Sequence, residues 1–155
     1  MIDHALASAD SLFFNADIEI SSSVRFLAPV RRLIEGLALE LGWSATDSKQ
    51  IKLAVDEAIT NKIRHAYESR PDARIRIEVA TTARGLVLRL TDEGARPDDA
   101  KLCARAKDSN TPGGMGTHII RDVMDEVLYE TVDNRNQLTL TKYLPASQSA
   151  KEGTR

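Results

Sequence analysis

Three polar side chains, Glu57, Asn61 and His65, recur at a spacing of four residues in one stretch of the chain. If this stretch is helical, the three side chains lie above one another on one face. A carboxylate can accept a proton, and an amide oxygen can ligate a hard cation such as Mg²⁺ while that cation also holds phosphate oxygens. The spacing therefore suits a site for a metal-bound phosphate compound, and it equally suits the solvated edge of an ordinary amphipathic helix.

The residues around this triplet have the apolar periodicity of a helix. The apolar side chains that would gather on the neighbouring sector are Ile51, Ala54, Val55, Ala58, Ile59, Ile63 and Ala66. Pro71 disfavours continuation of the helix, so we expect it to end near Tyr67. Such a helix would bury one side in a core and direct the polar triplet along another.

A second candidate is the segment Leu90-Thr-Asp-Glu-Gly94, in which an acidic residue ends a strand pattern and is soon followed by glycine. Asp92 there can accept a hydrogen bond from an amino group such as N6 of adenine, and Gly94 lets a ligand approach the backbone. Taken alone, the segment is also typical of a simple turn after a strand.

A third candidate is the glycine-rich segment Thr111-Pro-Gly-Gly-Met-Gly-Thr117, which leads directly into a helical pattern. Glycines allow successive backbone N–H groups to converge, and a helix N-terminus adds positive dipole, so the segment suits phosphate binding. The alternative is a flexible loop with a helix cap. The segment matches neither the G-x-x-x-x-G-K-[ST] loop nor the dinucleotide fingerprint G-x-G-x-x-G, so both of those folds are disfavoured.

The whole pattern predicts an α+β domain. Strands are expected at residues 12–20, 74–82, 86–91, 127–132 and 137–144, and helices at 24–41, from the caps at 44–47 to 67, and at 116–125, with residues 100–107 compatible with a short helix. Gly85 should supply a positive φ in the first hairpin. We expect a mixed sheet with helices on one face, forming a single domain at 12–144 between flexible termini at 1–11 and 145–155.

Composition disfavours several classes of protein. The chain is 42% hydrophobic and 28% charged, as is usual for a soluble globular protein. A net charge of −2, without a long run of one sign, argues against direct nucleic-acid binding. No apolar run is long enough to span a membrane, and no secretion signal is recognisable, so we expect a cytoplasmic protein. The single Cys103 allows no internal disulfide and fits that location.

In combination the three segments are far more specific than any one of them. The series Glu57-x-x-x-Asn61-x-x-x-His65-Ala-Tyr, Asp92-x-Gly94 and Gly113-Gly-Met-Gly116 resembles, in order and spacing, the ATP site of the GHKL superfamily. The form Glu-Ala-Ile-Thr-Asn, the segment that begins Gly-Gly-Met-Gly-Thr-His-Ile-Ile-Arg-Asp-Val and the terminal Leu-Thr-Leu-Thr-Lys look like the anti-sigma factor serine kinases of that superfamily. The resemblance extends over residues 12–144.

The resemblance implies a Bergerat fold, a two-layer α/β sandwich that holds ATP and Mg²⁺ between the central helix and a lid. It implies that Glu57 is the general base toward a substrate serine and that Asn61 ligates Mg²⁺. It also implies that Asp92, with Gly94 beside it, recognises adenine. The residues that match the phosphate-contacting glycine box, or stand near the phosphates at the end of the helix, are Gly113, Gly114, Met115, Gly116, Thr117, Arg64 and His65.

The resemblance also implies partners. A kinase of this group binds a sigma factor, phosphorylates a serine on an anti-sigma-factor antagonist, and is commonly a homodimer. One alternative is a regulatory switch module that binds nucleotide and proteins without useful phosphotransfer, against which the retention of Glu57 weighs. Another is the ATPase half of a histidine kinase, but His4 lies in a weakly patterned segment, and His65 and His118 fall within the nucleotide motifs.

Three features depart from the pattern of the family. Lys62 falls within the apolar stripe, where relatives usually have a small alanine, so the lysine must extend past the core or the helix must sit differently. Ala95-Arg-Pro97 follows Gly94 where many relatives have a second glycine, which puts close backbone approach at that point in doubt. The lid, at residues 105–112, is short, so no lid contact can be assigned from the sequence.

Overall fold

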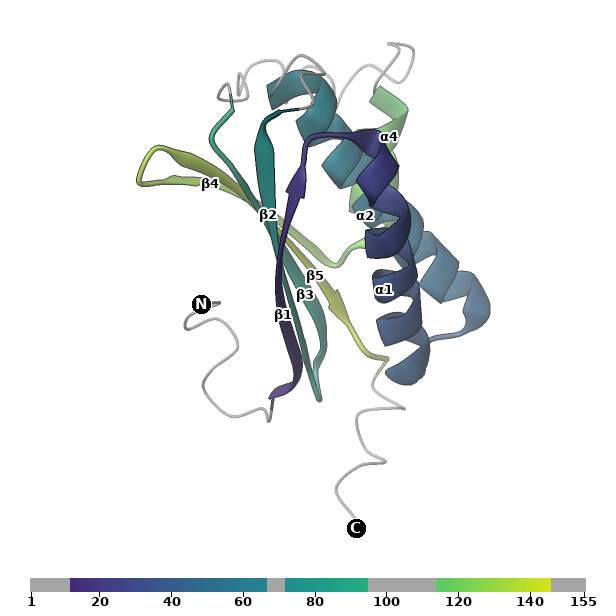
Figure 1. The fold of residues 1–155 in the computed structure, drawn as a ribbon. Helices are drawn as coiled ribbons and strands as arrows, with labels where there is room; N and C mark the ends of the chain where they lie inside the picture. The colour runs from purple at the N-terminus through teal and green to yellow at the C-terminus, as the bar shows by residue number, and fades with distance from the viewer. Residues whose placement is uncertain (1–11, 67–71, 95–113, 146–155) are drawn as a thin grey trace.

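The structure, a computed structural model, describes residues 12–66, 72–94 and 114–145 (Figure 1). The elements in chain order are β1 (Leu12–Ser21), the short 3₁₀ helix η1 (Val24–Phe26), α1 (Leu27–Glu40), α2 (Ala45–Ala66), β2 (Arg74–Thr82), β3 (Gly85–Asp92), α4 (Gly114–Val123), β4 (Glu126–Val132) and β5 (Arg135–Tyr143). The predictions for residues 1–11, 100–107, the lid at 105–112 and the tail after Pro145 lie outside the described residues.

The fold is α+β, with a five-stranded sheet in the order β1-β2-β3-β5-β4 and the helices on one face (Figure 1). This confirms the predicted fold class and the predicted strands. The first helix differs at its start, because Val24–Phe26 form a 3₁₀ turn before the α-helix begins at Leu27.

The prediction of a mixed sheet was wrong for the described strands, since every neighbouring pair is antiparallel. The connections explain the difference. Two helices, α1 and α2, separate β1 from β2, so the chain returns to the end at which β1 finished and β2 runs in the opposite direction. Strands β3 and β4 are each antiparallel to β5, which lies between them, so they run in the same direction without pairing.

The core lies between the sheet and the helices. Helix α2 packs against both α1 and α4 and contributes a continuous buried stripe, consisting of Ile51, Ala54, Val55, Ala58, Ile59 and Ile63. These are the residues that periodicity assigned to the apolar face, apart from Ala66, whose side chain lies outside the described residues. They meet the helix-facing side chains of the central strands, among them Ile77, Leu88 and Leu90, all of which are fully buried. Each such aliphatic side chain contributes roughly 1.5–3 kcal/mol through the removal of its surface from water.

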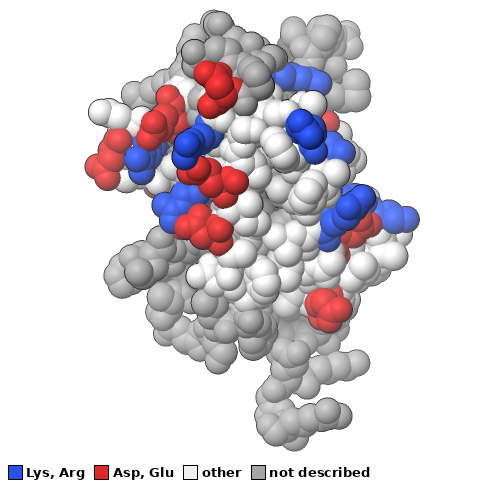
Figure 2. Space-filling model, viewed as in Figure 1, with Lys and Arg blue, Asp and Glu red and all other residues white. Residues whose placement is uncertain are grey.

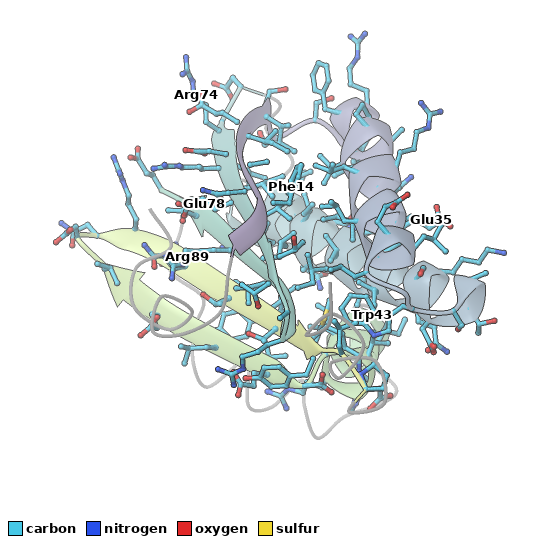
Figure 3. The ribbon with its side chains drawn as sticks, turned by 90° about the horizontal axis from the view of Figure 1, so that it is seen from below. Phe14, Glu35, Trp43, Arg74, Glu78 and Arg89 are labelled. Carbon is cyan, nitrogen blue, oxygen red and sulfur yellow. The ribbon has the colours of Figure 1, made fainter. Side chains whose placement is uncertain are left out.

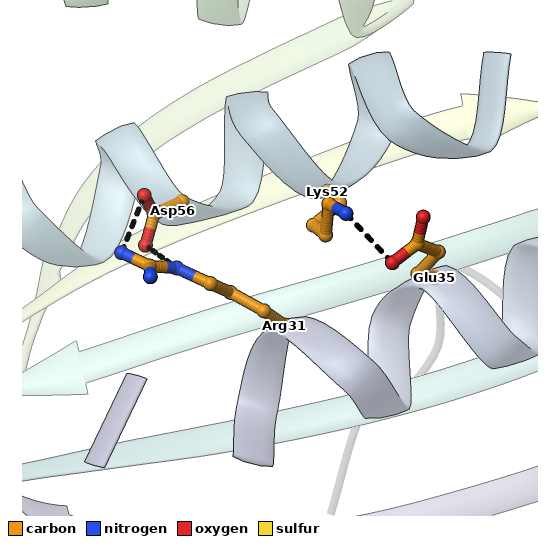
Figure 4. A network of polar contacts seen from close by, with 4 residues as sticks. All are labelled: Arg31, Glu35, Lys52 and Asp56. Atoms are coloured by element: carbon orange, nitrogen blue, oxygen red, sulfur yellow. Dashed lines mark hydrogen bonds and ion pairs between the residues drawn. The ribbon is translucent and has the colours of Figure 1, made fainter. Parts of the chain in front are cut away.

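Two ion pairs join α1 to α2 beside this core (Figure 4). The Arg31 guanidinium donates to both carboxylate oxygens of Asp56, at 2.6 and 2.8 Å. The Lys52 ammonium lies 2.6 Å from a carboxylate oxygen of Glu35. All four side chains are only partly exposed, and the bidentate geometry of the arginine fixes how the two helices sit along each other.

The other face of the sheet is charged. Figure 3 shows Glu78 and Arg89, which lie opposite each other on β2 and β3, extending from the side away from the helices. On β1, Asp17 pairs with Arg76, whose hydrogen bond lowers the pKa of that carboxyl. Charges of both signs alternate on the face seen in Figure 2, and neither sign forms a continuous patch there.

Gly85 opens β3 with a φ of 145°, which confirms the predicted positive φ. It lies opposite Tyr143 of β5, and the two backbones approach closely. A Cβ at this position would overlap the carbonyl oxygen of Lys142 and would lie 3.0 Å from the Cα of Tyr143. Glycine is therefore required here both for its backbone conformation and for its small size.

We expect Gly85→Ala to lower the free energy of unfolding by roughly 2–4 kcal/mol, because the positive φ alone costs about 1–3 kcal/mol and the overlap with β5 adds to it. The matched control is Gly36→Ala in helix α1, where nothing lies within 4 Å of the added carbon. That change should raise stability by about 0.5–1 kcal/mol. Urea denaturation measures both, and equal effects would mean that the close approach of β3 and β5 does not require glycine at position 85.

Candidate functional site

The predicted motifs converge at one end of the molecule. The C-terminal end of β3, the C-terminal end of α2 and the first turn of α4 all lie at the same end of the sandwich (Figure 1). Side-chain contacts confirm the approach of the first two, since Lys62 of α2 forms an ion pair with Asp92 of β3. Segments that are far apart in the sequence thus meet where the sheet and the helix layer end.

Asp92 faces the helix layer. It continues the alternation of Leu88 and Leu90 on β3, so its side chain points toward the core face rather than toward the charged face. The residue is only 2% exposed. A carboxylate at this depth is stable only with hydrogen-bonded partners.

Three donors satisfy the Asp92 carboxylate. Its Oδ1 accepts the backbone N–H of Gly94 at 2.9 Å and the side-chain amide of Asn136 at 3.4 Å. Its Oδ2 accepts the ammonium group of Lys62. The Asn136 amide also donates to the carbonyl oxygen of Gly94 at 3.0 Å, so that the turn after β3 is held from both sides. Asp92 and Gly94 thus form one rigid corner with α2 and β5.

The position of Lys62 on α2 explains this contact. It stands four residues after Ala58 and three after Ile59, in the middle of the buried stripe, and its side chain is only 10% exposed. The lysine extends past the core and reaches the acid at the end of β3. A lysine inside an apolar stripe requires a buried anion, and that requirement was the signal in the sequence that could have found the pair.

Asn136 is the other residue that sequence reasoning missed. The predicted strand at 137–144 left it outside the sheet, whereas the turn consists of Asp133 and Asn134, with φ of 50° and 61°, and β5 already begins at Arg135. Asn136 is consequently a strand residue directly opposite Asp92, and it is only 6% exposed.

The remaining predicted site residues are placed less completely. Glu57 and Asn61 are half-buried on α2, and Arg64 is exposed near its end. His65 belongs to the same helix, but its side chain lies outside the described residues, as does Gly113. The residues Gly114, Met115, Gly116 and Thr117 form the first turn of α4, with side chains that are not described.

A magnesium site at Asn61 fits this arrangement chemically. The described residues include no group of three or more His, Cys, Asp or Glu side chains that could hold a metal ion. Mg²⁺ bound to a nucleotide needs no such group, because phosphate oxygens and water supply most of its ligands and one protein oxygen can suffice. The amide of Asn61 can provide that oxygen.

None of the described helices is long and apolar enough to cross a membrane.

We expect Asn136→Ala to lower the free energy of unfolding by about 1–3 kcal/mol, because it leaves the Gly94 carbonyl without its donor and weakens the hold on Asp92. Asn134→Gly is the control, since this turn residue already has a positive φ that glycine adopts easily. Its effect should stay within about 0.5 kcal/mol. Urea denaturation of both variants checks the expectation, and an unchanged stability of Asn136→Ala would contradict it.

Known proteins are similar to this chain in sequence. Residues 20–142 match the family model described as histidine kinase-like ATPase domain. The serine/threonine-protein kinase BtrW of Bordetella bronchiseptica is 31% identical over 130 residues, which cover 81% of this chain and 92% of the relative. The serine-protein kinase RsbW of Bacillus subtilis is 28% identical over 143 residues, which cover 84% of this chain and 88% of the relative.

A solved structure has the same fold. The crystal structure of the RsbU and RsbW domains of Rv1364c from Mycobacterium tuberculosis superposes with a TM-score of 0.59 at 17% identity, over 86% of this chain and 34% of that one. At this identity the likeness concerns the fold alone. The sequence matches go further, because the family model spans most of the chain and its ATPase description implies the use of ATP. The chain belongs to the histidine kinase-like ATPase domain family, in the branch that includes these serine-protein kinases.

Proposed function

We propose that residues 12–144 form a single ATP- and Mg²⁺-dependent serine kinase domain that binds a sigma factor and phosphorylates a serine on an anti-sigma-factor antagonist. The observation that carries the proposal is the match to BtrW, a serine/threonine-protein kinase, along 92% of that protein's length. The retention of Glu57, Asn61, Asp92 and the glycine segment supports it. The protein would act in the cytoplasm, as a homodimer, without binding nucleic acid or membrane directly.

In this proposal the end of the sandwich binds the nucleotide. Asp92 accepts a hydrogen bond from the base, and Gly94 leaves room beside it. The first turn of α4, Gly114–Thr117, has backbone N–H groups without helical partners, and these donate to phosphate oxygens. Arg64, at the end of α2, adds positive charge nearby, with His65 next to it in the chain, and Asn61 would hold the metal through its amide oxygen. When bound there, Mg²⁺ would supply positive charge to neutralise the phosphate oxygens.

Glu57 is the proposed general base. It precedes Asn61 by one helical turn, so the two side chains leave α2 in similar directions. The Glu57 carboxylate accepts the proton of the substrate serine as the serine oxygen forms its bond to the γ-phosphorus, while the bond from that phosphorus to the ADP oxygen breaks. The substrate hydroxyl must then lie within hydrogen-bond distance of Glu57.

Asn61→Ala should weaken Mg·ATP binding by more than about tenfold, or 1.4 kcal/mol, because it removes the proposed metal ligand. Binding measured without Mg²⁺ should be nearly the same for this variant and the wild type. Thr60→Ala, at the adjacent position on α2, is the control and should bind normally. Calorimetry with and without Mg²⁺ measures these affinities, and an unchanged affinity of Asn61→Ala for Mg·ATP would refute the role of Asn61 as a metal ligand.

Glu57→Gln should bind ATP and the protein partners nearly normally while it transfers phosphate at least roughly a hundredfold more slowly, because a positioned base contributes about 10²–10⁴ in rate. The assay is transfer of radiolabelled phosphate from ATP to a serine of a co-encoded antagonist-domain protein. Glu40→Gln, an exposed carboxylate at the end of α1, serves as the control and should retain the wild-type rate.

Transfer by Glu57→Gln at the wild-type rate would mean that another group takes the proton. If the wild type itself labels no serine although it binds ATP, the chain is a nucleotide-binding switch module that acts only through protein binding. These two results differ in the behaviour of the wild type, so one set of assays separates them.

A further inference from the structure

Asp92, which accepts a hydrogen bond from the nucleotide base in the proposed function, already forms an ion pair with Lys62. The Asp92 side chain is 1% exposed and the Lys62 side chain 10%, so the pair is largely shielded from water. A charge pair at this depth is strong because little solvent screens it. Any base that reaches Asp92 therefore encounters an ammonium group beside it.

The hydrogen-bonding capacity of the pair can be counted. An ionised carboxylate offers about four lone-pair sites. Gly94 and Asn136 use the two on Oδ1, and Lys62 uses one on Oδ2. One acceptor site remains on Oδ2. The ammonium group of Lys62 has three N–H donors, of which Asp92 takes one, so it can still donate to a ligand. The pair thus presents one acceptor and at least one donor next to each other.

Purine bases differ in the hydrogen bonds that they can form with such a pair. Adenine has a donor at its 6-amino group and an acceptor at N1, whereas hypoxanthine has an acceptor at O6 and a donor at N1–H. A lone carboxylate matches the 6-amino group of adenine and repels the O6 of hypoxanthine, lone pair against lone pair. A carboxylate with an ammonium group beside it offers a partner at position 6 to both bases, because the carboxylate accepts the 6-amino group of adenine and the ammonium group donates to the O6 of hypoxanthine.

We infer that Lys62 is a specificity-determining residue that makes the base pocket tolerant of 6-oxopurines. This inference rests on the proposed function, since it takes Asp92 as the residue that contacts the base. Lys62 supplies the donor that an O6 atom needs, and Asp92 keeps the ammonium group in place. Without Lys62 the pocket would discriminate in favour of adenine.

The test compares Mg·ADP with Mg·IDP, which differ only at position 6 of the purine and at N1, and which carry no γ-phosphate to transfer. Calorimetry on the wild type should give dissociation constants for the two nucleotides within about threefold of each other. Lys62→Met, which keeps the length of the side chain but has no charge, should favour ADP by at least about tenfold, through the loss of one donor to O6.

Two further variants make the comparison specific. Lys62→Arg retains a donor beside Asp92 and should keep the ratio within about threefold, as in the wild type. Lys52→Met removes a lysine from an ion pair with Glu35 on the same helix, away from Asp92, and should leave the ratio unchanged. Thermal unfolding of each variant shows whether it is folded at the temperature of the measurement.

A wild type that prefers ADP by about tenfold or more would overturn the inference, even if Lys62→Met proved too unstable to study. A ratio in folded Lys62→Met equal to that of the wild type would overturn it as well. In both of these results the nucleotides still bind, so the proposed function survives. Failure of both nucleotides to bind the wild type would instead refute the proposed function and, with it, the inference.

Discussion

A buried carboxylate at the end of β3 is the constraint on which the rest of this end of the molecule depends. Removal of an ion from water costs several kcal/mol in a protein interior and is offset only when its partners are close and well oriented. Asp92 meets that condition through groups from three elements: the ammonium of Lys62 on α2, the amide of Asn136 on β5 and the backbone of Gly94. The position of α2 along the sheet is thereby linked to the position of the turn after β3.

Helix α2 is held from its other side by α1. The Arg31–Asp56 and Lys52–Glu35 pairs are partly exposed, so solvent screens them and their contribution to stability is modest. The greater part of the stabilisation comes from the apolar stripe between Ile51 and Ile63, which is buried against the strands. The ion pairs add a directional contact that aligns α2 along α1, while the buried stripe itself leaves Glu57 and Asn61 on the side of α2 that does not enter the core.

Local patterns in the sequence predicted most of the fold. Alternation predicted the strands, the spacing of three and four predicted α1 and α2, and Gly85 was correctly assigned a positive φ. The antiparallel pairing was missed because strand direction depends on how many helices return the chain, and periodicity within a segment carries no such information. The roles of Glu57, Asn61 and the glycine segment remain predictions.

The two residues that sequence reasoning left without a role, Lys62 and Asn136, have the same physical explanation. The partner of each is Asp92, which lies on a different element, and no local pattern identifies a contact between distant segments, although a lysine inside an apolar stripe signals a buried anion. In the sequence, Lys62 interrupts an apolar stripe, and Asn136 falls just outside the predicted strand at 137–144. Both are buried polar groups whose partners come from the tertiary fold.

The placement of two helices between β1 and β2 has a consequence for how the chain folds. Ile18 pairs with Ile77, so this edge of the sheet closes a loop that contains both α1 and α2, whereas β2 and β3 are joined by a tight hairpin. Closing a long loop costs more chain entropy before any contact is gained. The helical pair and the two hairpins can form locally, and we expect the β1 edge to join them last.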